Sequence, residues 1–145
     1  MREGTSRSRV GVALGVALAL AACSHAKEES RGVTAAVERW RAAVDADKEA
    51  AADALAAAPC TDAEVCEAKR ACLEVATPTV KSLALKTEVE RTLAEIRAGR
   101  IARESPEAQA LPGKLDEASR LLSEAASRIE PCDTRATALE RKYGR

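Results

Sequence analysis

Five cysteines and one histidine are the residues of this 145-residue chain whose side chains could do chemistry beyond charge pairing. Cysteine thiolates bind metals, attack substrates or form disulfides, and their spacing indicates which. The chain contains no C-x-x-C pair, which is usual in zinc sites and thioredoxin-like redox sites, and no C-x-x-C-H haem attachment. The cysteines therefore predict neither a metal site nor a cofactor.

The single histidine, His25, lies in a short polar stretch near the N-terminus. Catalysis by a Ser-His-Asp or Cys-His arrangement needs a histidine that is held beside a nucleophile and an orienting acid. A flexible polar stretch does not hold its side chains in place, and the chain has no G-x-S-x-G motif and no glycine-rich phosphate loop. We therefore expect no catalytic residues and no enzyme activity.

The fifth cysteine, Cys23, directly follows a short apolar run. Arg2, Arg7 and Arg9 come first, and residues 10–22 are then uninterrupted apolar or small residues. This run is too short to span a bilayer, which needs about 20 residues. A basic start followed by a short apolar run that ends in small residues is typical of an export signal.

The last four residues of this pattern, Leu20-Ala21-Ala22-Cys23, resemble the lipobox of bacterial lipoproteins. The resemblance implies that residues 1–22 are removed as a signal peptide and that Cys23 receives fatty acyl chains such as palmitate. Because two or three acyl chains anchor stably, the protein would be held on an envelope membrane, facing the periplasm. Ser24 follows the cysteine, and a residue other than Asp there implies the outer membrane in lipoproteins of the enterobacterial type.

The rest of the chain predicts a polar tether over residues 23–32 and one domain over residues 33–145. After residue 22 there remain 20 basic and 22 acidic residues, a net charge of −2, so nothing indicates binding to nucleic acid. The chain has no Phe, one Trp and one Tyr, and alanine supplies most of its apolar residues. Alanine favours helices, but each alanine buries little apolar surface. Disulfide cross-links would therefore help to stabilise a core built mainly from alanine.

The apolar spacing predicts an all-α fold, a small antiparallel bundle of about four helices. The first helix covers residues 33–58 and places Trp40 in the core, although Asp47 and Lys48 interrupt its apolar stripe. The second begins at a capping box, Thr61-Asp62-Ala63-Glu64. Pro78 then either kinks a long helix or begins a new one, which covers residues 79–98.

The last predicted helix covers residues 114–130 and is ended by Pro131. Its expected core seam repeats in steps of three and four residues: Leu115, Ala118, Leu122, Ala125 and Ile129. Beyond it, residues 133–145 are expected to form a short helix with Leu139 and Tyr143 on its inner side.

Four cysteines remain for pairing, Cys60, Cys66, Cys72 and Cys132, and an exported chain favours two disulfides. Cys66 and Cys72 are six residues apart on one predicted helix, about 9 Å along its axis, whereas bridged Cα atoms lie within about 7 Å. Cys60–Cys72 would need a longer reach still. The geometry therefore predicts Cys60–Cys66 together with Cys72–Cys132.

These observations predict a lipid-anchored envelope protein that acts as a binding adaptor or accessory subunit without catalysis. Its partners would be the membrane, through the acyl chains on Cys23, and an envelope protein that the sequence does not identify. The alternative is a structural lipoprotein that associates with itself through alanine-rich helix seams.

Overall fold

The structure is a computed structural model that describes the backbone of residues 13–144 and the side chains of residues 24–144. Over these residues it contains helices and no strand: α1 (Ala13–Ala42), η1 (Asp45–Asp47), α2 (Lys48–Ala57), α3 (Ala63–Arg97), α4 (Pro106–Gln109), α5 (Leu111–Ser127) and α6 (Ile129–Tyr143). The predicted all-α bundle is confirmed.

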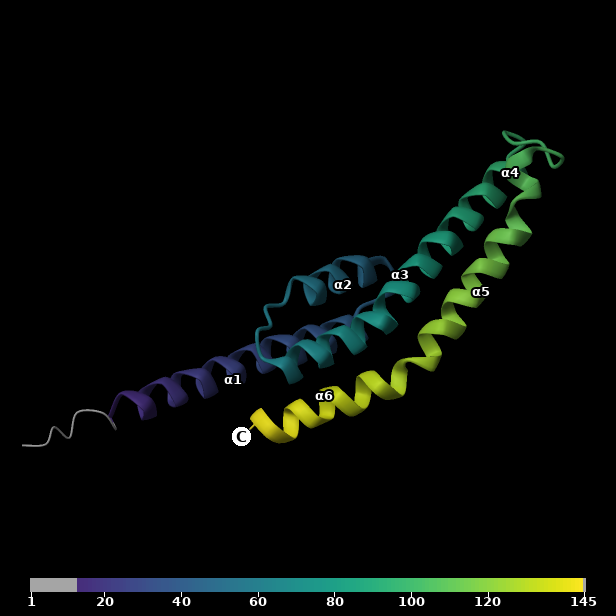
Figure 1. Ribbon diagram of the computed structural model, residues 1–145. Coiled ribbons are helices and arrows are strands. Elements are labelled where there is room, and N and C mark those ends of the chain that lie inside the picture. The colour runs from purple at the N-terminus through teal and green to yellow at the C-terminus, as the bar shows by residue number, and fades with distance from the viewer. Residues whose placement is uncertain (1–12, 145) are drawn as a thin grey trace, which may run out of the picture.

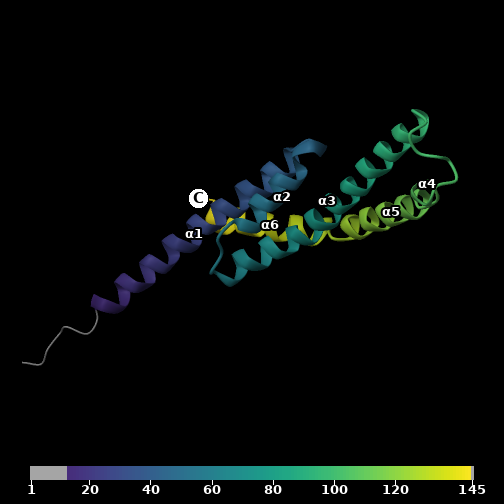
Figure 2. The same ribbon diagram turned by 90° about the horizontal axis from the view of Figure 1, so that it is seen from above.

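The longest helix, α3, packs against α1, α2, α4, α5 and α6. Helices α5 and α6 return along it in the opposite direction (Figure 1). Helices α1 and α2 pack mainly against the first part of α3, whereas its second part forms a projecting hairpin with α4 and α5 (Figures 1 and 2). The start of α1 and the chain's C-terminus lie toward one end, and α4 lies at the other.

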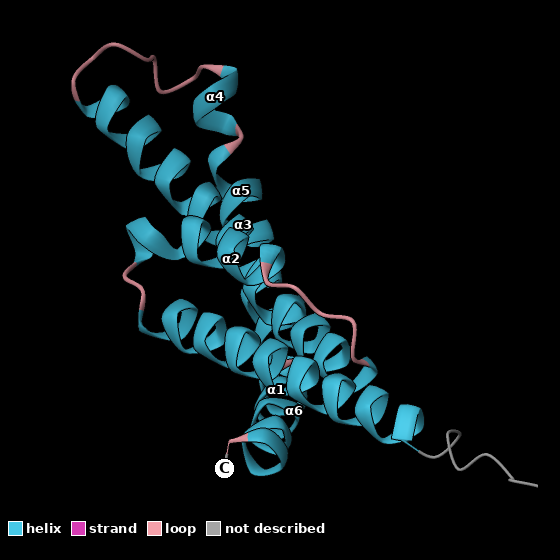
Figure 3. Cartoon of the chain, turned by 90° about the vertical axis from the view of Figure 1, so that its left-hand side faces the viewer, coloured by secondary structure: helices cyan, strands magenta, loops and turns pink. Residues whose placement is uncertain are grey.

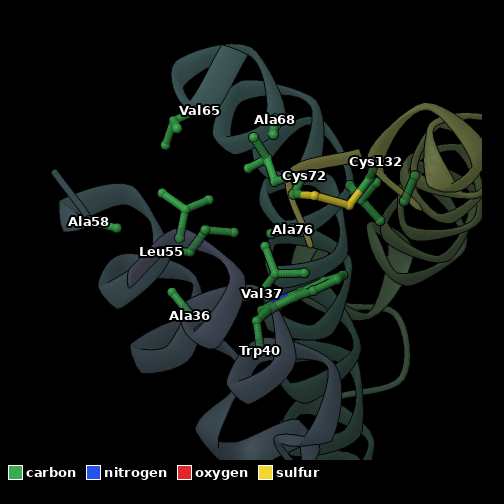
Figure 4. Packing of buried hydrophobic residues seen from close by; sticks show 14 residues of the cluster. Ala36, Val37, Trp40, Leu55, Ala58, Val65, Ala68, Cys72, Ala76 and Cys132 are labelled. Carbon is green, nitrogen blue, oxygen red and sulfur yellow. A yellow bond between two sulfur atoms is a disulfide. The ribbon is translucent and has the colours of Figure 1, made fainter. Parts of the chain in front are cut away.

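The core lies where α1, α2 and α3 meet, and it is built from small side chains. Its most deeply buried members include Val33, Val37, Leu55 and Val65, each at most 1% exposed. Figure 4 shows Val37, Leu55 and Val65 together with several alanines near Trp40 and the Cys72–Cys132 bridge. Trp40 is 8% exposed, which confirms its predicted place in the core.

The predicted first helix over residues 33–58 is wrong, because it is two helices that fold back on each other at η1 (Figure 3). The break falls where Asp47 and Lys48 interrupt the apolar stripe. Lys48 Nζ donates to the carbonyl oxygens of Trp40 at 2.7 Å and Arg41 at 3.1 Å, which have no partners within α1. The residue that breaks the stripe therefore caps the helix that ends there.

The predicted tether over residues 23–32 is also wrong, because this segment belongs to α1 and residues 26–30 pack onto the domain. Ala26, Glu29 and Ser30 are buried, at 9%, 4% and 2% exposure. A polar sequence without apolar periodicity suggested a solvated linker. The segment is held instead by a buried carboxylate, that of Glu29, which lies against the start of α3.

Two details at α3 differ from the expected capping box and proline break. Asp62, not Thr61, is the N-cap, and its side chain accepts from the backbone N–H groups of Glu64 at 3.0 Å and Val65 at 3.1 Å. Pro78 lies inside a continuous helix, so the alternative of a new helix at that point is excluded.

The predicted helix over residues 114–130 begins earlier, at Leu111, and ends at Ser127. Pro131 does not stop a helix; it lies in the first turn of α6, where its missing N–H has no intrahelical partner to lose. The expected tail helix is confirmed, because Leu139 is 2% exposed and Tyr143 packs against the core.

Of the five residues expected in the core seam of that helix, two are buried and three are exposed. Ala118 and Ala125 are buried, but Leu115, Leu122 and Ile129 are 49%, 50% and 48% exposed. Leu121 is buried in their place, so α5 is rotated relative to the prediction. The buried face of α5 contains Leu111, Ala118, Leu121 and Ala125, and a second column of large apolar side chains is half exposed.

Candidate functional site

The four paired cysteines form the predicted disulfides. Cys60 and Cys66 have Cα atoms 5.2 Å apart, and their bridge fastens the loop before α3 to its first turns. Cys72 and Cys132 have Cα atoms 4.6 Å apart, and their bridge joins α3 to the first turn of α6. Both cysteines of the second pair are at most 2% exposed, so this bridge belongs to the core.

The side chain of Cys23 lies outside the part of the chain whose side chains are described, so its lipidation stays a prediction. The backbone at this position belongs to α1. Among the described residues, no helix is long and apolar enough to cross a membrane. The same residues contain no group of three or more His, Cys, Asp or Glu side chains that could hold a metal ion.

The carboxylate of Glu29 joins the beginning of the domain to the start of α3. Its Oε2 accepts from the backbone N–H groups of Thr61 at 2.8 Å and Asp62 at 3.1 Å, and its Oε1 accepts from the Thr61 hydroxyl at 2.9 Å. The Thr61 N–H holds the pKa of Glu29 below its ordinary value, although burial opposes this shift. His25 Nδ1 lies 3.2 Å from the same carboxylate.

His25 is the exposed member of this cluster. Its side chain is 61% exposed, and its partner Glu29 is fully engaged with the backbone and hydroxyl groups that precede α3. The role of the pair is structural, because it fixes the chain just after Cys23 onto the domain.

An open apolar groove runs between α1 and α3 on one side and α5 and α6 on the other. We call it the Trp40 groove and define it by these lining residues: Trp40, Val75, Thr79, Leu122, Ala126 and Ile129. It holds about 770 Å³, which lies within the size range of protein ligand sites. Arg41 and Asp133 form an ion pair at its rim.

Trp40 forms one wall of this groove. Lys48 Nζ lies 5.0 Å from the centroid of its ring, so a cation–π contact covers part of it. Its indole Nε1 is buried and has no hydrogen-bond partner among the described residues. Buried N–H groups are usually paired, so this donor is an unsatisfied polar atom of the core next to the groove.

Sequence reasoning missed the groove because it assigned Leu122 and Ile129 to the core. One signal was present: Leu121 and Leu122 are adjacent, and only one of two neighbours on a helix can face the same partner. The spacing did not show which of the two leucines is buried.

Comparison with known proteins found no match for this chain among protein-family models, curated protein sequences or solved structures. Its function must therefore be argued from its own residues.

Proposed function

We propose that this protein is a lipid-anchored adaptor of a bacterial envelope, with acyl chains on Cys23 and its domain on the periplasmic side of the outer membrane. The residues Leu20-Ala21-Ala22-Cys23 behind a basic and apolar start support the anchor. The two disulfides support an oxidising compartment such as the periplasm, because structural disulfides persist there and are rare in the cytosol.

The Trp40 groove is the observation that carries the adaptor role. It combines an uncovered apolar surface, walls contributed by rigid helices and a buried donor without a partner. Exposed apolar patches on folded proteins mark binding surfaces, and no described cluster of side chains supplies a nucleophile with its base. Binding rather than catalysis is therefore the activity that this surface supports.

The anchor is tested by replacing the cysteine in a bacterial host. Cells expressing the wild-type chain, Cys23→Ala or the neighbouring control Ser24→Ala are fed an alkyne analogue of palmitate and then fractionated. We expect the wild type and Ser24→Ala to carry the label and to pellet with membranes, and Cys23→Ala to lose both. A Cys23→Ala chain that still carries the label would contradict the anchor.

The alternative role, a structural lipoprotein that associates with itself, is favoured by the same exposed side chains of α5. It is decided by the oligomeric state of the protein in mild detergent over a range of concentrations. A monomer at every concentration excludes self-assembly. A size that grows with concentration supports it instead of the adaptor role.

A further inference from the structure

Three of the large apolar side chains that the described residues expose lie in one line. Leu115, Leu122 and Ile129 are each about half exposed, and they follow one another at intervals of seven residues along α5 and into α6. A seven-residue interval returns to nearly the same side of a helix. The result is an apolar ridge, and two of its members, Leu122 and Ile129, line one side of the Trp40 groove.

Small residues lie beside this ridge. Ser119 and Ala126 are each four residues after a ridge leucine, so they share its side of the helix. Depressions between large side chains receive the side chains of a packed helix, as in knobs-into-holes contacts. This alternation of large and small residues has the form of a helix-packing surface that no helix of the described residues covers.

Trp40 in the opposite wall carries a polar atom without a partner in the described part of the chain. Trp40 is more than nine-tenths buried, and its Nε1 has no hydrogen-bond partner among the described residues. An unpaired buried donor costs free energy. Because Nε1 itself is covered by protein atoms, a bound segment would contact only the exposed part of Trp40.

The outer edge of the ridge is acidic. Asp116 directly follows Leu115, Glu130 directly follows Ile129, and both carboxylates are exposed on the same side of the ridge. Neither makes an ion pair or hydrogen bond in the described part of the chain. At the other rim Arg41 is already paired, with Glu38 and Asp133. The uncompensated charge beside the groove is therefore negative.

We propose that the Trp40 groove binds an amphipathic α-helix of a protein partner, with large apolar residues every three or four positions and Lys or Arg along one flank. This deepens the adaptor role proposed above by naming the chemistry of the partner. A second copy fits less well. An antiparallel α5 centred on Leu122 would bring Asp116 within two positions of Glu130 of the other copy on the same flank, and such like charges repel.

The contact area also favours a partner helix over a second copy. The half-exposed ridge alone offers on the order of 300 Å² per copy, against about 800 Å² per partner in a stable complex. A single helix that lies in the groove contacts both walls at once, including Trp40 and Val75. Helices that bind in this way present anchors at positions i, i+3 or i+4, and i+7.

The test uses two synthetic peptides about five helical turns long, without aromatic residues. Both carry leucine and alanine on one face; one carries lysine along a flank, and the other carries glutamate at the same positions. Trp40 is the only tryptophan in the chain, so its fluorescence reports on the groove directly. We expect a saturable change with the lysine peptide and at least tenfold weaker binding of the glutamate peptide.

Two substitutions and one control make the test specific. Leu122→Asn should weaken binding of the lysine peptide at least tenfold, whereas Leu93→Asn, at an exposed leucine of α3 outside the groove, should leave it unchanged. The double variant Asp116→Lys with Glu130→Lys should reverse the preference between the peptides. All four side chains are exposed, and circular dichroism verifies that each variant remains folded.

Several results would overturn this proposal. Equal affinity for the two peptides, or no saturable binding, removes the charged helix as the occupant. Saturation by laurate without any effect of the charge reversal assigns the groove to a lipid. A dimer that Leu122→Asn dissociates assigns it to a second copy. Peptide affinity is measured with the wild-type and Cys23→Ala chains, so failure of the lipid anchor leaves this result intact.

Discussion

The disulfide between Cys72 and Cys132 should contribute more stability than the one between Cys60 and Cys66. It links positions 60 residues apart, whereas the other links positions six residues apart. A cross-link stabilises by restricting the unfolded chain, and the restriction grows with the logarithm of the loop length. This model gives about 4 kcal/mol for the long loop and about 2 kcal/mol for the short one.

The perturbation is a pair of double substitutions, Cys72→Ala with Cys132→Ala, and Cys60→Ala with Cys66→Ala. The first pair also removes two core sulfur atoms, each at most 2% exposed, so its cost should exceed the loop term alone. Native domains are stable by only about 5–15 kcal/mol, so this variant should be marginally folded. In urea denaturation followed by circular dichroism, about 4 kcal/mol shifts the midpoint by roughly 2 M.

Reduced wild-type protein is the matched control, because it loses both cross-links without losing any side chain. It should unfold at lower urea than either double variant that keeps the other bridge. The reasoning is refuted if the Cys60 and Cys66 substitutions cost as much as the Cys72 and Cys132 substitutions. It is also refuted if reduction leaves the urea midpoint of the wild type in place.

Three further predictions concern single residues. The pKa of Glu29 is lowered in the folded protein from an ordinary value of 4.5. Its ionised carboxylate therefore contributes fully to the free energy of unfolding above pH 4.5, and this contribution is lost as the pH falls through the folded-state pKa. Glu29→Gln should therefore lower the urea midpoint at pH 7 and flatten its fall toward pH 3, and Glu28→Gln, at an exposed neighbour, should do neither. Gly99 follows α3 with φ of 71° and open space around it, so Gly99→Ala should cost about 1 kcal/mol through the backbone alone. Thermal unfolding should show this loss, and Gly99→Asn should lose less, because asparagine tolerates that conformation; equal stability of Gly99→Ala and the wild type would argue against it. Lys48→Met removes two hydrogen bonds to the end of α1 and should cost about 1 kcal/mol in urea unfolding. The control Lys86→Met removes only an exposed 3.6 Å ion pair to Asp45 and should cost less than about 0.5 kcal/mol; a ranking in the opposite order would contradict the capping role of Lys48.

Helix content and disulfide pairing were predictable because both depend on local geometry. The rise of a helix separates Cys66 from Cys72 too far for a bridge, whatever the tertiary structure. That exclusion and the length of the second helix were enough to choose the pairing that the structure has. The all-α fold followed in the same way from apolar spacing.

The features that sequence reasoning missed depend on contacts between distant segments. Residues 24–32 are ordered by Glu29, whose partners Thr61 and Asp62 lie more than 30 residues away. A polar segment carries no periodic signal for such a contact. The break between α1 and α2 likewise depends on Lys48 reaching back to Trp40 and Arg41.

The rotation of α5 was missed for a different reason. A helix that carries both an alanine column and a leucine column has an apolar face, but its spacing does not say which column meets the neighbour. Here the Cys72–Cys132 bridge brings the Cα atoms of α3 and α6 within 4.6 Å, and such close approach favours small side chains at the contact. The inner face of α5 combines Ala118 and Ala125 with Leu121, whereas Leu115 and Leu122 are exposed, and Leu122 lines the Trp40 groove.

The continuity of α1 has a mechanical consequence. If Cys23 carries acyl chains as proposed, only six residues of helix, a rise of about 9 Å, separate the membrane attachment from the docked Glu29. Helix α3 runs in the same general direction as α1 and, at 35 residues, is about 50 Å long (Figure 1). A flexible tether would let the domain sample many orientations. A stiff stalk would instead hold the α3–α5 hairpin at a set height above the bilayer, so reach as well as surface chemistry would select its partners.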